Sequence, residues 1–173
     1  SYTYRELSQL SDQFAAFLRS SGVRKGDVIA CFAGQGLESA LAHLGSYKLG
    51  AIVAPLSQLY GPEAVKHVLT DCDAKVVVTE RNLWNRIKEY RHELPIQLVI
   101  LSGGAERDEI DFDHTLVESL NLNFVRELTK ADDPALLLYT SGSTGMPKGI
   151  LHRQRLLRGY LSSVSLFYEM DMS

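Results

Sequence analysis

The sequence has few of the residues that mark secreted, metal-binding or membrane proteins. Its two cysteines, Cys31 and Cys72, lie in unrelated contexts, so we expect two reduced thiols and no disulfide framework. Its five histidines fit no ligand spacing, which predicts no metal site. No apolar run approaches the roughly 18 residues that a membrane-spanning helix needs, and residues 1–6 lack the apolar core of a signal peptide. We therefore expect a cytoplasmic protein without a membrane partner.

The chain also lacks a strong excess of either charge. Its 18 lysines and arginines nearly balance 21 acidic residues, so we expect no nucleic-acid partner. A compact domain of 173 residues buries about two-thirds of its unfolded surface. The sequence therefore predicts a single domain over residues 1–173.

Short apolar segments alternate with amphipathic ones over the first hundred residues. A first helix has Thr3 as its cap, Glu6 as the capping-box partner and Gly22 at its end. Further helices are predicted at 37–49, 61–71 and 83–90, and strands at 28–32, 51–55, 75–79 and 96–101. Each strand is continuously apolar, which is typical of a parallel sheet covered on both faces. The predicted fold class is α/β, a doubly wound and mainly parallel sheet with helices on both faces.

The second part of the chain is less regular. We expect a surface loop at 102–113, a short helix at 114–120, a polar connection at 124–133 and a hairpin at 134–152. A helix predicted over 154–173 has much apolar surface, so we expect the remainder of the same polypeptide to pack on it. Because the sequence has no initiating methionine and this helix lacks a terminating residue, we also expect a chain truncated at both ends.

The segment Gly34-Gln35-Gly36-Leu37-Glu38-Ser39 imitates a dinucleotide-binding fingerprint. However, Ser39 replaces the third glycine, and no acidic residue follows the second strand to hold a ribose. A plain strand-to-helix turn is therefore the better interpretation.

A glycine-rich loop, residues 140–148, follows the apolar segment 135–138. The segment Tyr139-Thr140-Ser141-Gly142-Ser143-Thr144-Gly145-Met146-Pro147-Lys148-Gly149 offers backbone N–H groups, hydroxyls and one cation, which suit a polyphosphate. It is not a Walker loop, because Pro147 stands where the second glycine belongs and no hydroxyl residue follows Lys148. The alternative is a hairpin turn without a ligand, but a turn needs far fewer such residues.

The segment from Thr140 to Gly149 resembles the signature phosphate loop of the adenylate-forming superfamily. That superfamily includes AMP-forming acyl-CoA synthetases, luciferases and peptide-synthetase adenylation domains. Agreement extends over nearly the whole chain and is closest to the acetyl-CoA synthetase branch. The segments that carry it are 3–7, 11–12, 22–27, 47–56, 61–65, 74–79 and 148–152.

The resemblance implies that Lys148 is a catalytic residue that offsets charge on the pyrophosphate leaving group. It also implies which residues contact the ATP phosphates: Thr140, Ser141, Gly142, Ser143, Thr144, Gly145 and Lys148. The magnesium ligand and the adenine, acyl and catalytic-lysine sites are expected after Ser173.

The resemblance further implies an ATP-dependent acid–CoA ligase that uses Mg²⁺. It would convert a short-chain carboxylate, with acetate favoured, into an acyl-adenylate and then a CoA thioester. The chain alone is expected to be inactive. Three alternatives stay open: another adenylate-forming enzyme (a medium-chain or aryl acid ligase, or a peptide-synthetase adenylation domain), a phosphate-binding module without chemistry, and a doubly wound protein that binds a phosphorylated ligand elsewhere.

Three other residues have two interpretations each. Arg81 and Arg86 fall near the positions where acetyl-CoA synthetases contact the CoA phosphates, but exposed helix charges are commoner. His152, just past the glycine-rich loop, could support that loop or point into the core, and a structural role is favoured.

Overall fold

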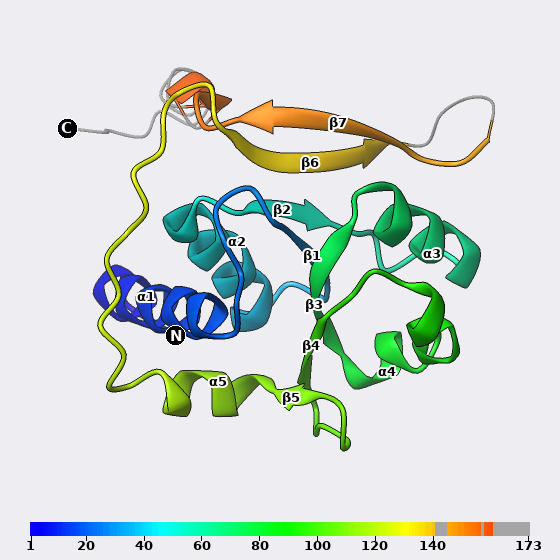
Figure 1. Cartoon of the computed structure of the whole chain (residues 1–173), viewed down its shortest axis with the longest axis horizontal. Helices are drawn as coiled ribbons and strands as arrows, with labels where there is room; N and C mark the ends of the chain where they lie inside the picture. The colour runs from blue at the N-terminus through cyan, green and yellow to red at the C-terminus, as the bar shows by residue number, and fades with distance from the viewer. Residues whose placement is uncertain (141–144, 157, 161–173) are drawn as a thin grey trace.

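One seven-stranded sheet organises the computed structural model, which describes residues 1–140, 145–156 and 158–160 (Figure 1). Its strand order is β5-β4-β3-β1-β2-β6-β7, with every pairing parallel except the antiparallel pair β6–β7. The strands are β1 Val28–Phe32, β2 Ile52–Pro55, β3 Ala74–Glu80, β4 Leu98–Ser102, β5 Ile110–Asp111, β6 Pro134–Thr140 and β7 Lys148–Arg153.

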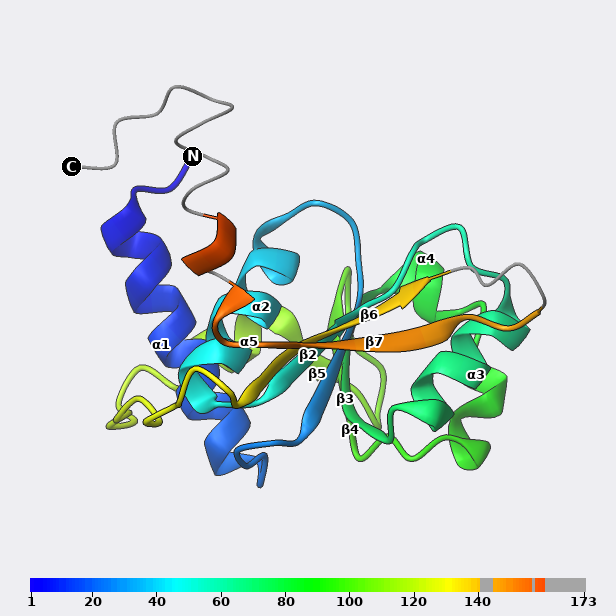
Figure 2. The same cartoon turned by 90° about the horizontal axis from the view of Figure 1, so that it is seen from above.

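Helices cover both faces of this sheet. They are α1 Tyr4–Ser20, α2 Leu37–Leu49, α3 Pro62–Asp71, α4 Arg81–Trp84, the 3₁₀ helix η1 Lys88–Glu93 and α5 Phe112–Glu118. Helix α1 packs against α2 and α5 on one face, while α3, α4 and η1 lie on the other (Figures 1 and 2). The prediction of a doubly wound, mainly parallel α/β fold is confirmed.

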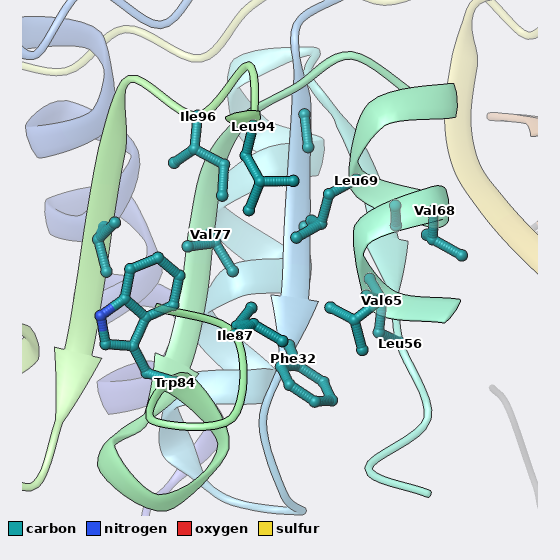
Figure 3. Packing of buried hydrophobic residues seen from close by; sticks show 14 of the residues in the cluster. Phe32, Leu56, Val65, Val68, Leu69, Val77, Trp84, Ile87, Leu94 and Ile96 are labelled. Atoms are coloured by element: carbon teal, nitrogen blue, oxygen red, sulfur yellow. The ribbon is translucent and has the colours of Figure 1, made fainter. Parts of the chain in front are cut away.

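Two hydrophobic cores result, because successive strand residues point to opposite faces. In β3, Val76 and Val78 join the core under α1 and α2, whereas Val77 joins the core under α3 and α4. Figure 3 shows the second core, in which Phe32 lies near Val65 of α3, whereas Trp84 lies farther from α3, on the side of Val77. The central strands are buried on both sides, which explains their continuously apolar sequences.

Local signals set the ends of the first helices as predicted. Thr3 Oγ1 accepts a hydrogen bond from the Glu6 N–H at 3.2 Å, and Glu6 Oε2 accepts one from the Thr3 N–H at 2.7 Å. This capping box begins α1. Helix α2 spans the predicted residues and ends at Gly50, whose φ of 71° is left-handed and favours glycine.

The predicted helix at 83–90 is wrong. Helix α4 ends at Trp84, and a turn leads into η1, where Ile87 and Tyr90 make i→i+3 backbone hydrogen bonds. Trp84 and Ile87 are three residues apart, and the turn between them directs both side chains into the core. An i→i+3 spacing eclipses side chains in a 3₁₀ turn, which accounts for this placement.

Other boundaries also differ from the sequence prediction. The expected loop at 102–113 contains β5, which pairs with β4. Helix α5 begins at Phe112 rather than at 114, because the Asp111 side chain caps it. Strand β4 begins at Leu98, two residues later than expected, and β6 is longer than expected at both ends.

The predicted helix over 154–173 lies mostly outside the described residues. Of those described, residues 156 and 158–160 are helical. Among the helices that the structure describes, none combines the length and apolar character needed to cross a membrane.

Candidate functional site

The glycine-rich loop follows the carboxyl end of β6. Because β1, β2, β3 and β6 run parallel, the connections that leave their carboxyl ends meet at one edge of the sheet. In open α/β sheets this is the edge where ligands bind. Helix α3 lies beside this end of the β6–β7 hairpin (Figure 2).

The structure places two of the predicted phosphate-binding residues opposite each other. Thr140 is the last residue of β6 and Lys148 the first of β7, and they are direct cross-strand partners. Directly opposed residues of an antiparallel pair lie on the same face with Cβ atoms about 5 Å apart. Thr140, Gly145 and Lys148 are all exposed, so the side chains of Thr140 and Lys148 leave the hairpin on one face at an accessible position. The predicted residues 141–144 lie outside the described part of the chain.

Side chains from outside the loop hold both of its ends, and no sequence pattern indicated them. Tyr139 Oη donates a hydrogen bond to Asp71 Oδ2 at 2.6 Å, and Tyr60 Oη donates to the Tyr139 carbonyl at 3.2 Å. On the other strand, His67 Nε2 lies 3.0 Å from the Pro147 carbonyl oxygen. Only a protonated Nε2 can make this bond, which assigns the tautomer of His67.

Tyr139 and the two cysteines, which could act as nucleophiles, are kept protonated. Burial, followed by the hydrogen bond to Asp71, raises the pKa of Tyr139. Burial also raises the pKa of Cys72 to about 11 and raises the pKa of Cys31. Both cysteines are buried free thiols, so they contribute to packing and offer no thiolate for chemistry.

Arg81 and Arg86 each have partners within the chain. Arg81 Nη2 lies 2.6 Å from Glu109 Oε2 and also donates to the Gly104 carbonyl, which joins α4 to the segment before β5. Arg86 donates to the carbonyl of Gln58 at 2.8 Å and to that of Tyr60. These contacts favour structural roles for both arginines over the CoA-phosphate contact.

His152 lies far from the glycine-rich loop. It is half-buried in β7 and pairs with Leu136. It lies four residue steps along the strand from Lys148, which corresponds to about 13 Å. This separation supports the structural role favoured for His152.

The fingerprint-like segment at 34–39 is a strand-to-helix turn in the structure. The Gly34 N–H donates to Glu80 Oε1 at 2.5 Å, and Gly36 is the N-cap of α2. An internal carboxylate thus occupies the amide that a pyrophosphate would need. Within the described residues, no three histidine, cysteine or acidic side chains gather as they would around a metal ion.

The fold agrees with a direct comparison to known proteins. Residues 1–172 match the family described as AMP-binding enzyme. The chain belongs to the AMP-binding enzyme family. The predicted membership of the adenylate-forming superfamily is therefore confirmed.

Relatives of this AMP-binding chain include enzymes named acetyl-coenzyme A synthetase. That of Shewanella sp. (strain MR-4) is 32% identical over 185 residues, which cover 96% of this chain and 28% of the relative. That of Photobacterium profundum is 33% identical over 172 residues, which cover 87% of this chain and 26% of the relative. The chain thus spans less than a third of the length of these curated relatives.

Solved structures give the same fold. A crystal structure of the anthranilate CoA ligase AuaEII with anthranoyl-AMP matches 94% of this chain and 32% of that chain, with a TM-score of 0.84 and 27% identity. A putative long-chain-fatty-acid CoA ligase from Rhodopseudomonas palustris CGA009 matches 99% of this chain and 43% of that chain, with a TM-score of 0.88. At 20% identity the second likeness concerns the fold alone.

Proposed function

We propose that this chain supplies the phosphate-binding part of an ATP-dependent, AMP-forming acid–CoA ligase. The favoured substrate is a short-chain carboxylate, with acetate first. The observation that supports the proposal is the cross-strand pair Thr140–Lys148, which brings a hydroxyl residue and a lysine to one face of the hairpin in a chain of the AMP-binding enzyme family. The names of the relatives at 32% and 33% identity favour acetate among the acids.

The residues present fit a nucleoside triphosphate. Lys148 is an exposed cation, and Gly145 has a φ of 144°, a conformation that few side chains permit and that turns the backbone tightly before Met146 and Pro147. A lysine is a compact charge suited to phosphate oxygens, and hydroxyls and backbone amides complete such a cradle. ATP supplies an electrophilic phosphorus and a pyrophosphate leaving group. Lys148 would orient that pyrophosphate and offset its charge, while Thr140 would donate a hydrogen bond.

Magnesium and CoA complete the proposed reaction. Mg²⁺ would accompany ATP, with its protein ligand outside residues 1–173, and CoA would accept the acyl group. Because the chain spans under a third of its relatives, we expect residues 1–173 alone to be inactive.

ATP–pyrophosphate exchange in the complete polypeptide that carries this chain tests the proposal. Acetate, propionate, hexanoate, benzoate and anthranilate should be compared, and the highest kcat/KM is expected with acetate. Lys148→Ala should lower exchange about 100-fold, because one charge-stabilising group at a reacting centre has an effect of this order. Lys148→Arg should retain part of the activity, and Lys88→Ala, at an exposed position on η1, should match the wild type. Full exchange in Lys148→Ala would overturn the catalytic role of the loop.

The alternatives predict other outcomes. A preference for benzoate or anthranilate would assign an aryl acid ligase, for which the anthranilate CoA ligase offers a structural parallel at 27% identity. Binding of ATP without exchange on any acid would indicate a phosphate-binding module. The third alternative is a ligand bound elsewhere, and a loop far from any strand edge would favour it. In the structure Thr140 is the last residue of β6 and Lys148 the first of β7, so the loop joins two paired strands.

A further inference from the structure

Three hydrogen bonds reach both ends of the glycine-rich loop from one side of the sheet. Tyr60, in the connection between β2 and α3, and His67 on α3 donate two of them, and Asp71 on α3 accepts the third. Sequence separations of 68 to 80 residues make these tertiary contacts rather than local turn contacts. Helix α3 lies beside this end of the hairpin in both overall views (Figures 1 and 2).

Helix α3 places His67 and Asp71 toward the hairpin. His67 and Asp71 are four residues apart, so they lie on one face of the helix. Another face, with Val65, Val68 and Leu69, is buried in the core that Figure 3 shows. The core therefore fixes the helix, and the helix carries the two polar side chains to the hairpin.

The first end of the loop is held through Tyr139. Its ring packs on the core under α3, its hydroxyl donates to Asp71, and its carbonyl accepts from Tyr60. A raised pKa keeps this phenol protonated and so keeps it a donor. Tyr139 directly precedes Thr140, so these contacts leave little freedom at the start of the loop.

The second end is held through Pro147. This residue is buried, its φ is fixed by its ring, and its carbonyl accepts the hydrogen bond from His67. Lys148 is the next residue along the chain. A constraint on the carbonyl of Pro147 therefore acts on the peptide plane from which Lys148 begins.

Tyr60, which bonds the first end of the loop, is itself held in place by Arg86. Arg86 donates to the carbonyls of Gln58 and Tyr60, which fixes the connection that carries the Tyr60 ring. The guanidinium also lies 5.8 Å from the centroid of the Phe32 ring, within the usual cation–π range. Each of these contacts joins the loop ends to the buried core.

We propose that Tyr60, His67 and Asp71 are positioning residues that hold the two ends of the glycine-rich loop and thereby set where Lys148 lies. We call these three residues the α3 brace; Tyr60 and Asp71 bond Tyr139, and His67 bonds the Pro147 carbonyl. The inference rests on the proposed function, since it assigns a task to Lys148. No member of the brace is assigned a contact with the substrate.

The test uses the complete polypeptide and two independent measurements. Hydrogen exchange of the amides of residues 137–140 and 148–150 reports on the loop ends without any substrate. ATP–pyrophosphate exchange gives kcat and KM for ATP. The variants are Tyr139→Phe, which removes the hydroxyl that bonds Asp71, and His67→Leu, which removes the donor to Pro147.

Both variants should speed amide exchange at the loop ends and lower kcat/KM for ATP about tenfold, the effect of losing one hydrogen bond to a well-positioned group. His67→Gln retains an N–H donor at similar reach and should recover activity to within about threefold of the wild type. Tyr139→Phe combined with His67→Leu should lose less than the product of the single losses, because both act through the placement of Lys148.

Tyr90→Phe is the matched control. Tyr90 Oη also donates to a carboxylate on α3, that of Glu63, at 3.4 Å, but Glu63 is not one of the residues that bond the hairpin ends in the described part of the chain. This variant should leave amide exchange at the loop ends and kcat/KM unchanged. Wild-type amide exchange at 137–140 and 148–150 in Tyr139→Phe and His67→Leu would overturn the brace. An inactive wild type would instead overturn the proposed ligase, and the amide exchange would still decide whether the brace holds the loop.

Discussion

Gly149 lies directly beneath the ring of Tyr139, its cross-strand partner. A Cβ built on Gly149 would come within 3.2 Å of Tyr139 Cζ and 3.3 Å of its Oη, and within 3.1 Å of Leu137 Cδ1. A side chain at this position would displace the ring whose hydroxyl bonds Asp71. The glycine therefore serves packing within the hairpin rather than an unusual backbone angle.

Gly149→Ala should lower the free energy of unfolding by about 1–2 kcal/mol, because adding a methyl group to a tightly packed site forces a shift of its neighbours. Urea unfolding followed by the fluorescence of Trp84, the single tryptophan, measures the change. Gly61→Ser is the control, since a Cβ there meets no atom within 4 Å and serine is a favourable N-cap for α3. Equal stability of Gly149→Ala and the wild type would show that the Tyr139 ring is free to move.

The ion pair of Arg81 with Glu109 should make stability depend on pH. Burial acts to raise the pKa of Glu109, but the hydrogen bonds from Arg81 and from the Glu106 N–H outweigh it and hold that pKa below its usual 4.5. A lowered carboxyl pKa contributes stability above the unfolded value, and this contribution is lost as the pH falls through the folded value. The relevant window therefore lies below about pH 4.5.

Glu109→Gln should consequently cost about 1 kcal/mol at pH 7, as expected for a charge-assisted bond to a side chain that is 8% exposed. The difference from the wild type should shrink as the pH falls below about 4.5, which thermal unfolding over a pH series measures. Glu118→Gln, which removes an exposed partner of His114, should change stability by less than about 0.5 kcal/mol at any pH. A gap between Glu109→Gln and wild type that is constant with pH would contradict the assignment.

Much of the fold followed from local patterns. The limits of α1 and α2 depend on a capping box and on Gly50, and both signals are read from neighbouring residues. Strand β5 and the break between α4 and η1 could not be predicted in this way. They depend on the pairing of β5 with β4 and on the contacts of Arg81 and Arg86 with distant carbonyls and carboxylates.

The candidate site likewise contains residues that local sequence predicted and residues that it did not. Thr140, Gly145 and Lys148 were predicted because a phosphate loop is a continuous stretch of glycine, hydroxyl and lysine residues. Tyr60, His67 and Asp71 were missed, since each meets the hairpin only after the sheet has formed. The spacing of His67 and Asp71 predicts a shared face of one helix, but neither this spacing nor Tyr60 in the preceding connection indicates that the face meets the hairpin.

Glu80 should be required for the turn between β1 and α2. Its carboxylate accepts from the Gly34 N–H, so Glu80→Ala leaves that amide without its partner and should cost about 1–2 kcal/mol. Glu80→Gln keeps an acceptor oxygen and should recover most of the loss. Wild-type protein should show no saturable binding of NADH by fluorescence, because this carboxylate occupies the amide. Tight NADH binding would restore the dinucleotide interpretation of residues 34–39.

Arg86→Lys separates the two roles considered for that arginine. If Arg86 holds the connection of Gln58 to Tyr60, lysine cannot donate to both carbonyls with the same geometry, and stability should fall by about 1 kcal/mol. The KM for CoA should then change no more than the KM for ATP, because the effect passes through the loop ends and not through a CoA phosphate. Arg107→Lys, at an exposed position, should match the wild type in both respects. Thioester formation measured at varied CoA and varied ATP decides between the roles: a rise in KM confined to CoA, with unchanged stability, would assign Arg86 to the CoA phosphates.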